Sequence, residues 1–198
     1  MSLIPVFKIG VWNAWIFMSV FLIQMIPMMF INKQAGKRSH LPPEIRKNKS
    51  EKYVSTLANA IWLIALLYSV FLPFLTGTAW FYSGLITFII GLCILGVATV
   101  NFIAAPADHP ITNGVYRLTR HPMYLSTFLI CMSAGIACAS WLFILLTIIM
   151  MYCFHKEALI EEKYCLNRYG DEYQKYMNAV PRWIGMNFRG SACSCLPW

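Results

Sequence analysis

Long runs of uncharged, mostly apolar residues alternate with short polar segments in this sequence. The runs cover residues 11–31, 57–75, 80–100 and 124–154. A helix of about 20 residues is long enough to cross the ~30 Å hydrocarbon core of a bilayer. Only 12% of the residues are charged, whereas soluble domains carry roughly 25%. Because charges are costly in hydrocarbon, this pattern predicts an all-α integral membrane protein.

The last run, 124–154, is too long for one span and too short for two full ones. Small residues at its centre, 133–140, favour a turn, which predicts a helical hairpin with arms at 123–138 and 141–156. A single long tilted helix is the alternative. We prefer the hairpin because it keeps the basic segments before and after it on the same side of the membrane.

The net charge of +8 does not indicate nucleic-acid binding, because of where the charges lie. Every Lys and Arg except Lys8 falls within 32–52, 113–124 or 154–198, and the eight acidic residues lie in or beside the same segments. Basic segments that flank apolar runs are typical of cytoplasmic loops facing anionic lipid. We therefore expect about five spans, an N-terminus outside, and three polar segments in the cytoplasm.

The stretch Asn113-Gly-Val-Tyr-Arg-Leu-Thr-Arg-His-Pro-Met-Tyr124 is the most polar segment between two apolar runs. Pro122 suits the first turn of a helix and restrains His121 to an extended backbone. A helix that starts there has unpaired N–H groups at Met123 and Tyr124, and such groups attract carboxylate or phosphate. The structural alternative is that His121 only caps the helix and that the arginines only anchor lipid headgroups.

A second polar block, 157–182, follows the expected hairpin. Glu157 and Glu161 lie four residues apart and so share one face of a helix. This helix should stop at Tyr169-Gly170, and a second amphipathic helix should end before Pro181. The four histidines and seven cysteines show no metal-ligand spacing, so we expect no metal site.

Taken together, these blocks resemble a known family in their order and spacing. They are Gly114-Val-Tyr116, Arg120-His-Pro-x-Tyr124, Glu161-Glu162, Tyr169-Gly-Asp-Glu-Tyr173 and Pro181-Arg182. They are similar to the isoprenylcysteine carboxyl methyltransferases and their relatives among the phospholipid methyltransferases. The resemblance covers residues 100–185 and implies a membrane enzyme that transfers a methyl group from S-adenosylmethionine to a lipophilic acceptor, leaving S-adenosylhomocysteine. It divides the chain into three spans with a basic loop (1–100), a methyltransferase region (101–185) and a tail (186–198).

The resemblance also implies which residues hold the cofactor. By position they are Asn101, Asp108, His109, Pro110, Ile111, Tyr116, His121, Pro122, Met123, Tyr124 and Glu161. The helix start at Met123 would receive the methionine carboxylate, Glu161 would accept from the amino group or the ribose, and Tyr116 with Ile111 would flank the adenine. Arg120 and Arg182 are the candidates for steering an anionic acceptor.

The sequence departs from the family at one position. Carboxyl methyltransferases of eukaryotic type have an Arg one helical turn before the residue that matches Glu161, whereas this chain has Glu157. A substrate carboxylate would then need Lys156, His155 or Arg120 instead. Two alternatives stay open: an N-methyltransferase in which Glu157 lies near the amine of a lipid headgroup, and a non-catalytic lipid-binding membrane protein.

Overall fold

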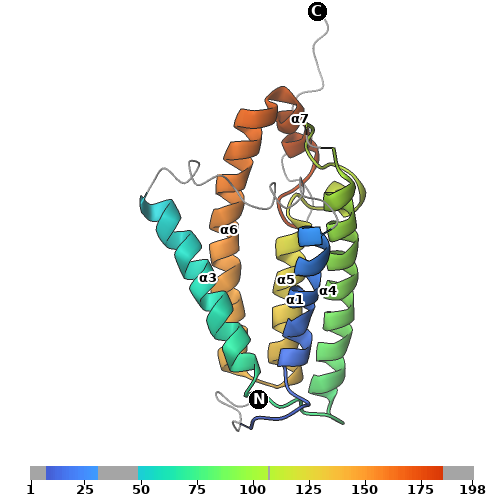
Figure 1. The fold of residues 1–198 in the computed structure, drawn as a ribbon, viewed down its shortest axis with the longest axis vertical. Coiled ribbons are helices and arrows are strands. Elements are labelled where there is room, and N and C mark those ends of the chain that lie inside the picture. The colour runs from blue at the N-terminus through green and yellow to red at the C-terminus, as the bar shows by residue number, and fades with distance from the viewer. Residues whose placement is uncertain (1–7, 31–48, 107, 185–198) are drawn as a thin grey trace, which may run out of the picture.

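The computed structural model describes residues 8–30, 49–106 and 108–184. Within these residues the chain forms six α-helices and one short 3₁₀ turn (Figure 1). Their bounds are α1 Trp15–Phe30, α3 Lys49–Ser69, α4 Ala79–Ala104, the 3₁₀ turn η2 Gly114–Arg117, α5 Pro122–Ala137, α6 Trp141–Tyr169 and α7 Asp171–Ala179. The predicted all-α class is confirmed. Residues 32–48 of the predicted basic segment 32–52 and the whole predicted tail 186–198 lie outside the described residues.

The hairpin predicted for 124–154 is confirmed as two helices, α5 and α6, and not one. The chain turns at Cys138–Ser140, where Ala139 takes a positive φ of 48°. Ser140 then starts α6, since its hydroxyl accepts a hydrogen bond from the N–H of Phe143 at 3.3 Å. A serine in this position satisfies one of the N–H groups that the first turn of a helix leaves unpaired.

α4 packs closely along α5 because two glycines remove side chains from the contact. A Cβ added at Gly84 would lie 2.7 Å from the backbone N of Ala137, and one at Gly91 would lie 3.0 Å from Ile130. Gly96 does not share this role among the described residues, since a Cβ there would meet nothing within 4 Å. Close contact between helices is therefore found at two of the three glycines of the run 80–100.

Two of the helices are long and apolar enough to cross a membrane, α4 and α6. α5 has 16 residues, which is about 24 Å and short of the ~30 Å core. α1 also has 16 residues, and α3 begins eight residues before the expected span, with Lys49, Glu51 and Lys52 in its first turn. The five-span count therefore stays a prediction.

The outer surface of the long helices is apolar. α4 exposes Ile86 by 60% and Val100 by 65%, and α6 exposes Leu145 and Ile148 by about half of their surface. Such rows of exposed apolar side chains are unusual for a protein in water and are expected of one surrounded by lipid. Between helices, Gln24 of α1 donates to Thr99 of α4 at 3.1 Å, and polar side chains often join membrane helices in this way.

The polar parts of the chain gather at one end of the bundle. The loop 105–121 and α7 both lie beyond the ends of α4 and α5, near the last turns of α6 (Figure 1). α6 runs without a break from its apolar half into the predicted polar helix from Glu157, and it stops at Tyr169 before Gly170, as expected. This arrangement brings the two polar blocks of the sequence into contact.

The glycine contact between α4 and α5 can be tested with a matched pair of substitutions. Gly84→Ala should lower stability by about 1–3 kcal/mol, because the added methyl group meets backbone atoms that must move. Gly96→Ala adds the same group into open space and should change stability by less than about 0.5 kcal/mol. Unfolding in detergent, followed by circular dichroism, would measure both. Equal effects would contradict the packing.

Candidate functional site

The start of α5 is the centre of the candidate site. Pro122 is the first residue of α5, as predicted, and is fully buried. The residue before it, His121, has φ −126° and ψ 61°, and its side chain makes no capping hydrogen bond to the helix. The first N–H groups of a helix have no partner within the helix, so this start offers donors toward the polar side of the bundle.

His121 lies between two adjacent carboxylates of α6. Its Nε2 is 3.2 Å from Oε1 of Glu162, and its Nδ1 is 3.4 Å from Oε2 of Glu161. The side chain is only 8% exposed. An imidazole that faces acceptors at both nitrogens must carry a proton on each, which is the charged form. The predicted cofactor ligand His121 therefore already binds two groups of the protein.

Glu162 is the most heavily bonded carboxylate of the site. Arg182 donates to it twice, from Nε at 2.8 Å and from Nη2 at 2.6 Å. Nε of Arg120 forms an ion pair with Oε1 at 3.4 Å. With His121, three cations thus surround one carboxylate whose side chain is 4% exposed. This bidentate contact, with two hydrogen bonds from one guanidinium, is a strong arrangement for an arginine and a carboxylate.

These contacts shift the pKa of two groups, the Glu162 carboxyl and the His121 imidazole. Burial alone would raise the pKa of Glu162, but the hydrogen bonds from Arg182 and His121 and the charge of Arg120 outweigh it and lower the pKa to about 2. Burial alone would lower the pKa of His121, but Glu161 and Glu162 outweigh it and raise the pKa. Both groups lie in the polar part of the chain, and both shifts favour the charged form of the group.

The segment 181–183 is bonded to the loop that precedes α5. The N–H of Arg120 donates to the carbonyl of Pro181 at 3.0 Å, and the hydroxyl of Thr119 donates to the carbonyl of Arg182 at 2.7 Å. Trp183 then reaches α6, where its Nε1 donates to Nδ1 of His155 at 3.3 Å. These bonds hold the guanidinium of Arg182 in place beside Glu162.

Tyr124 links α5 to α6 directly. Its hydroxyl donates to Oε1 of Glu161 in a short hydrogen bond. Its ring stacks on Phe154 with centroids 4.8 Å apart and on His121 with centroids 5.6 Å apart. The predicted ligands His121, Tyr124 and Glu161 therefore meet at one point, although 37 residues separate the last two in the sequence.

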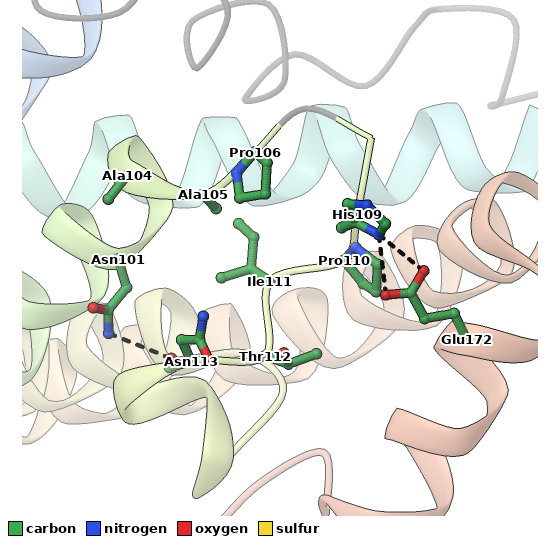
Figure 2. A pocket seen from close by; sticks show the side chains of 10 residues that line it. All are labelled: Asn101, Ala104, Ala105, Pro106, His109, Pro110, Ile111, Thr112, Asn113 and Glu172. Carbon is green, nitrogen blue, oxygen red and sulfur yellow. Dashed lines mark hydrogen bonds and ion pairs between the residues drawn. The ribbon is translucent and has the colours of Figure 1, made fainter.

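Four other predicted ligands line a cavity of about 210 Å³ (Figure 2). These are Asn101, His109, Pro110 and Ile111. The amide of Asn101 donates to the carbonyl of Asn113 at 3.5 Å and fixes the loop on the end of α4. Gly114 follows with φ +61°, and a Cβ there would lie 1.9 Å from Asn101, so only glycine fits.

An exposed ion pair lies at the edge of the cavity. Nδ1 of His109 is 3.2 Å from a carboxylate oxygen of Glu172 at the start of α7, as Figure 2 shows. The two side chains are 63% and 53% exposed. This contact connects the loop before η2 to α7, and exposed pairs of this kind contribute little to stability.

The remaining predicted residues lie apart from both groups. Tyr116 is 8% exposed, and its carbonyl accepts a hydrogen bond from the Tyr176 hydroxyl at 2.7 Å. Burial is the largest cause that raises the pKa of Tyr116, so its hydroxyl stays neutral. Glu157 is 5% exposed, one turn before Glu161. Asp108 is exposed beside the cavity.

Sequence reasoning did not identify Glu162, Thr119, Glu172 and Trp183 as site residues. Two sequence blocks pointed to Glu162, namely the adjacent acids Glu161-Glu162 and the Pro181-Arg182 block. Neither block shows which of the two carboxylates faces Arg182. The other contacts join residues more than 20 positions apart and leave no local pattern. Among the described residues no group of His, Cys, Asp and Glu has the arrangement of a metal site.

Two comparisons with known proteins find methyltransferases. The sequence profile of the family described as phospholipid methyltransferase matches residues 72–172. The protein-S-isoprenylcysteine O-methyltransferase of Schizosaccharomyces pombe (strain 972 / ATCC 24843) is 28% identical over 75 residues, which is 37% of this chain and 32% of the relative. The chain thus aligns with only about a third of that relative's length.

Glu162 should carry much of the stability of this end of the protein. Glu162→Gln leaves Arg182 and His121 without their buried counter-charge, which typically costs about 3–5 kcal/mol. The matched control is Glu172→Gln, which breaks an exposed pair and should cost less than about 1 kcal/mol. Thermal unfolding in detergent would compare them. If Glu162→Gln is as stable as the control, the ion pairs of Glu162 do not contribute to stability as expected.

The raised pKa of His121 predicts a loss of stability at alkaline pH. Its contribution is complete below the ordinary imidazole pKa of about 6.5 and is lost as the pH rises through the raised pKa of the folded protein. The melting temperature should therefore fall as the pH rises above about 6.5, and the fall should be smaller in His121→Asn. Parallel curves for the two proteins would show that His121 is not the titrating group.

Proposed function

The chain belongs to the phospholipid methyltransferase family, and from this premise we propose that it transfers a methyl group from S-adenosylmethionine to the carboxylate of a lipophilic acceptor. The observation that carries the proposal is the meeting of the α5 start with Glu161 at the same end of the bundle as a loop-lined cavity. The first is a buried, charged cluster, and the second is a cavity with both polar and apolar lining residues, which suits a cofactor with an amino-acid end and a nucleoside end.

The residues present fit such a cofactor. The start of α5 offers N–H groups at Met123 and Tyr124 to the methionine carboxylate, without a side-chain cap that would compete. Glu161 would accept from the amino group or the ribose. The cavity beside Asn101 and Ile111 is smaller than the roughly 300–1,000 Å³ of most ligand pockets. We therefore assign to it the adenine alone, and expect the loop with Asp108, His109 and Pro110 to adjust around it.

The chemistry needs little from the protein. S-adenosylmethionine supplies a methyl group on a sulfonium, which an acceptor oxygen can displace in line to leave S-adenosylhomocysteine. A carboxylate is already ionised at neutral pH, so no general base is needed. The residues of the site would contribute by holding the two reactants in line, which can lower the barrier by several kcal/mol, and by excluding water.

The charge of the cluster supports an anionic acceptor. Arg120, His121 and Arg182 are opposed by two carboxylates, so one positive charge is in excess when His121 is protonated. Arg182 makes two bonds to Glu162 and is therefore less available than Arg120 to steer an acceptor. The relative from Schizosaccharomyces pombe is named for O-methylation of an isoprenylcysteine, which also favours a carboxylate.

A second candidate function rests on Glu157. Its carboxylate is 5% exposed and lies where eukaryotic-type carboxyl methyltransferases have an arginine. A buried carboxylate suits an ammonium group better than an acid, which favours N-methylation of an amine-bearing lipid headgroup. Such a reaction needs a base for the amine proton, and its rate should rise through the pKa of the amine. A lipid-binding protein without activity is the remaining alternative.

We also propose how the chain sits in the membrane. Five spans with the N-terminus outside place the loop 105–121, the last turns of α6 and α7 in the cytoplasm. The clustering of the polar segments at one end of the bundle supports a common side for them (Figure 1). The cofactor would then enter from the cytoplasm, and the acceptor from the bilayer between helices.

Cofactor binding tests the proposal most directly. We expect purified protein to bind S-adenosylhomocysteine in calorimetry, and Glu161→Gln to weaken this binding about tenfold, because a hydrogen bond to a charged group is lost. Tyr82→Phe, an exposed tyrosine at the far end of α4, is the control and should bind as the wild type does. No binding by the wild type would refute the enzymatic proposal.

The label from tritiated S-adenosylmethionine would then separate the two acceptor classes. A base-labile label in a lipid extract indicates a methyl ester, and a base-stable label indicates a methylated amine. Cofactor binding without any label would favour the non-catalytic alternative.

A further inference from the structure

Trp183 fixes the protonation pattern of His155. The indole Nε1–H can only donate, and it points at Nδ1 of His155 at 3.3 Å. Nδ1 must therefore be the acceptor, and a neutral imidazole that accepts at Nδ1 carries its proton on Nε2. A charged imidazolium has protons on both nitrogens and would not accept this bond. The contact thus selects a neutral His155 with an N–H at Nε2.

The segment that carries Trp183 is itself held in place. The carbonyl of Pro181 accepts from the N–H of Arg120, and the carbonyl of Arg182 accepts from the Thr119 hydroxyl. The guanidinium of Arg182 donates to Glu162. The Trp183 ring contacts two imidazoles, with centroids 5.9 Å from His121 and 6.3 Å from His155. Trp183 therefore contacts both the charged cluster and His155, and it orients the latter.

His155 lies where the apolar half of α6 ends. The residues before it, from Trp141, carry no charge, and Lys156 follows it, with Nζ 5.4 Å from the centre of the exposed Tyr152 ring. An amine folded back on an aromatic ring in this way is typical of the boundary between lipid and water. Glu162 lies two helical turns further, about 10 Å along the axis. His155 thus stands on the lipid side of the cluster.

The Nε2–H of His155 is available for a ligand. The side chain is half-buried, and within the described part of the chain Nε2 has no hydrogen-bond partner. Because Nδ1 faces Trp183, ring geometry directs Nε2 away from the indole. A neutral N–H donor can bond to an oxygen anion, but it cannot accept a proton from an ammonium group.

We propose that His155 binds the methyl acceptor, and that its Nε2–H donates to an oxygen of the acceptor's carboxylate. This inference rests on the proposed methyl transfer and narrows it to an acid acceptor. It also supplies the group that the chain needs where Glu157 replaces an arginine. A neutral donor orients the carboxylate without neutralising it, so the oxygen keeps its charge as a nucleophile.

Two amide substitutions separate the two ring nitrogens. The side-chain amide of His155→Gln places an N–H near the position of Nε2, whereas that of His155→Asn places it near Nδ1, where Trp183 already donates. The probes are N-acetyl-S-farnesylcysteine, which ends in a carboxylate, and S-farnesylcysteamine, which carries an amine on the same lipid chain. Their binding would be measured by calorimetry in the presence of saturating S-adenosylhomocysteine.

We expect the wild type and His155→Gln to bind the carboxylate probe within about threefold of each other, and His155→Asn to bind it about tenfold more weakly. The amine probe should not distinguish the three proteins. Equal affinity of His155→Asn and wild type for the carboxylate probe would overturn the inference, as would equal weakening in both variants or no binding of this probe by the wild type. Failure to bind S-adenosylhomocysteine would instead refute the proposed function itself.

A second measurement does not depend on the folding of these variants. Nitrogen-15 spectra of labelled histidine should show His155 protonated at Nε2 and unprotonated at Nδ1. Trp183→Phe keeps an aromatic ring but removes the donor, so both tautomers should appear and the carboxylate probe should bind about two- to threefold more weakly. A wild-type His155 protonated at Nδ1 would overturn the inference.

Discussion

A single buried carboxylate, Glu162, joins its own helix α6 to two segments that lie far away in the sequence. It bonds to His121 before α5, to Arg182 after α7 and, by ion pairing, to Arg120. Moving charges out of water costs several kcal/mol per ion, and this cost is offset only when every partner is present in good geometry. These charges therefore add to the hydrogen bonds from Arg120, Thr119 and Trp183 that hold the segment 181–183 beside α5 and α6.

The same cluster determines what the neighbouring residues are free to do. Because His121 faces Glu161 and Glu162 with its two nitrogens, both nitrogens contact these carboxylates in this arrangement. Glu161 is held by His121 and by the Tyr124 hydroxyl, so its direction is fixed before any ligand binds. A site that is organised in advance loses less entropy when it binds its ligand.

The parts of this structure that could be predicted from sequence are those with a local cause. Pro122 begins a helix because its ring fixes φ and removes a donor that the first turn does not need, and Gly170 ends one because it accepts a positive φ. The small residues around Ala139 gave the turn of the hairpin for a similar reason. The ion pairs of Glu162 have no such local cause, since their geometry depends on how α6 is rotated against α5. The roles of the predicted ligands in binding a cofactor stay predictions.

The position of the site at the edge of the apolar region has a chemical consequence. The proposed cofactor is charged and soluble in water, and the proposed acceptor is soluble in lipid, so the two can meet only where both environments are in reach. An in-line displacement also needs the two reactants to approach from opposite sides. The charged cluster around Glu162 and the His155–Trp183 pair lie about two helical turns apart along α6. In the proposed reaction, α6 would carry contacts to both reactants.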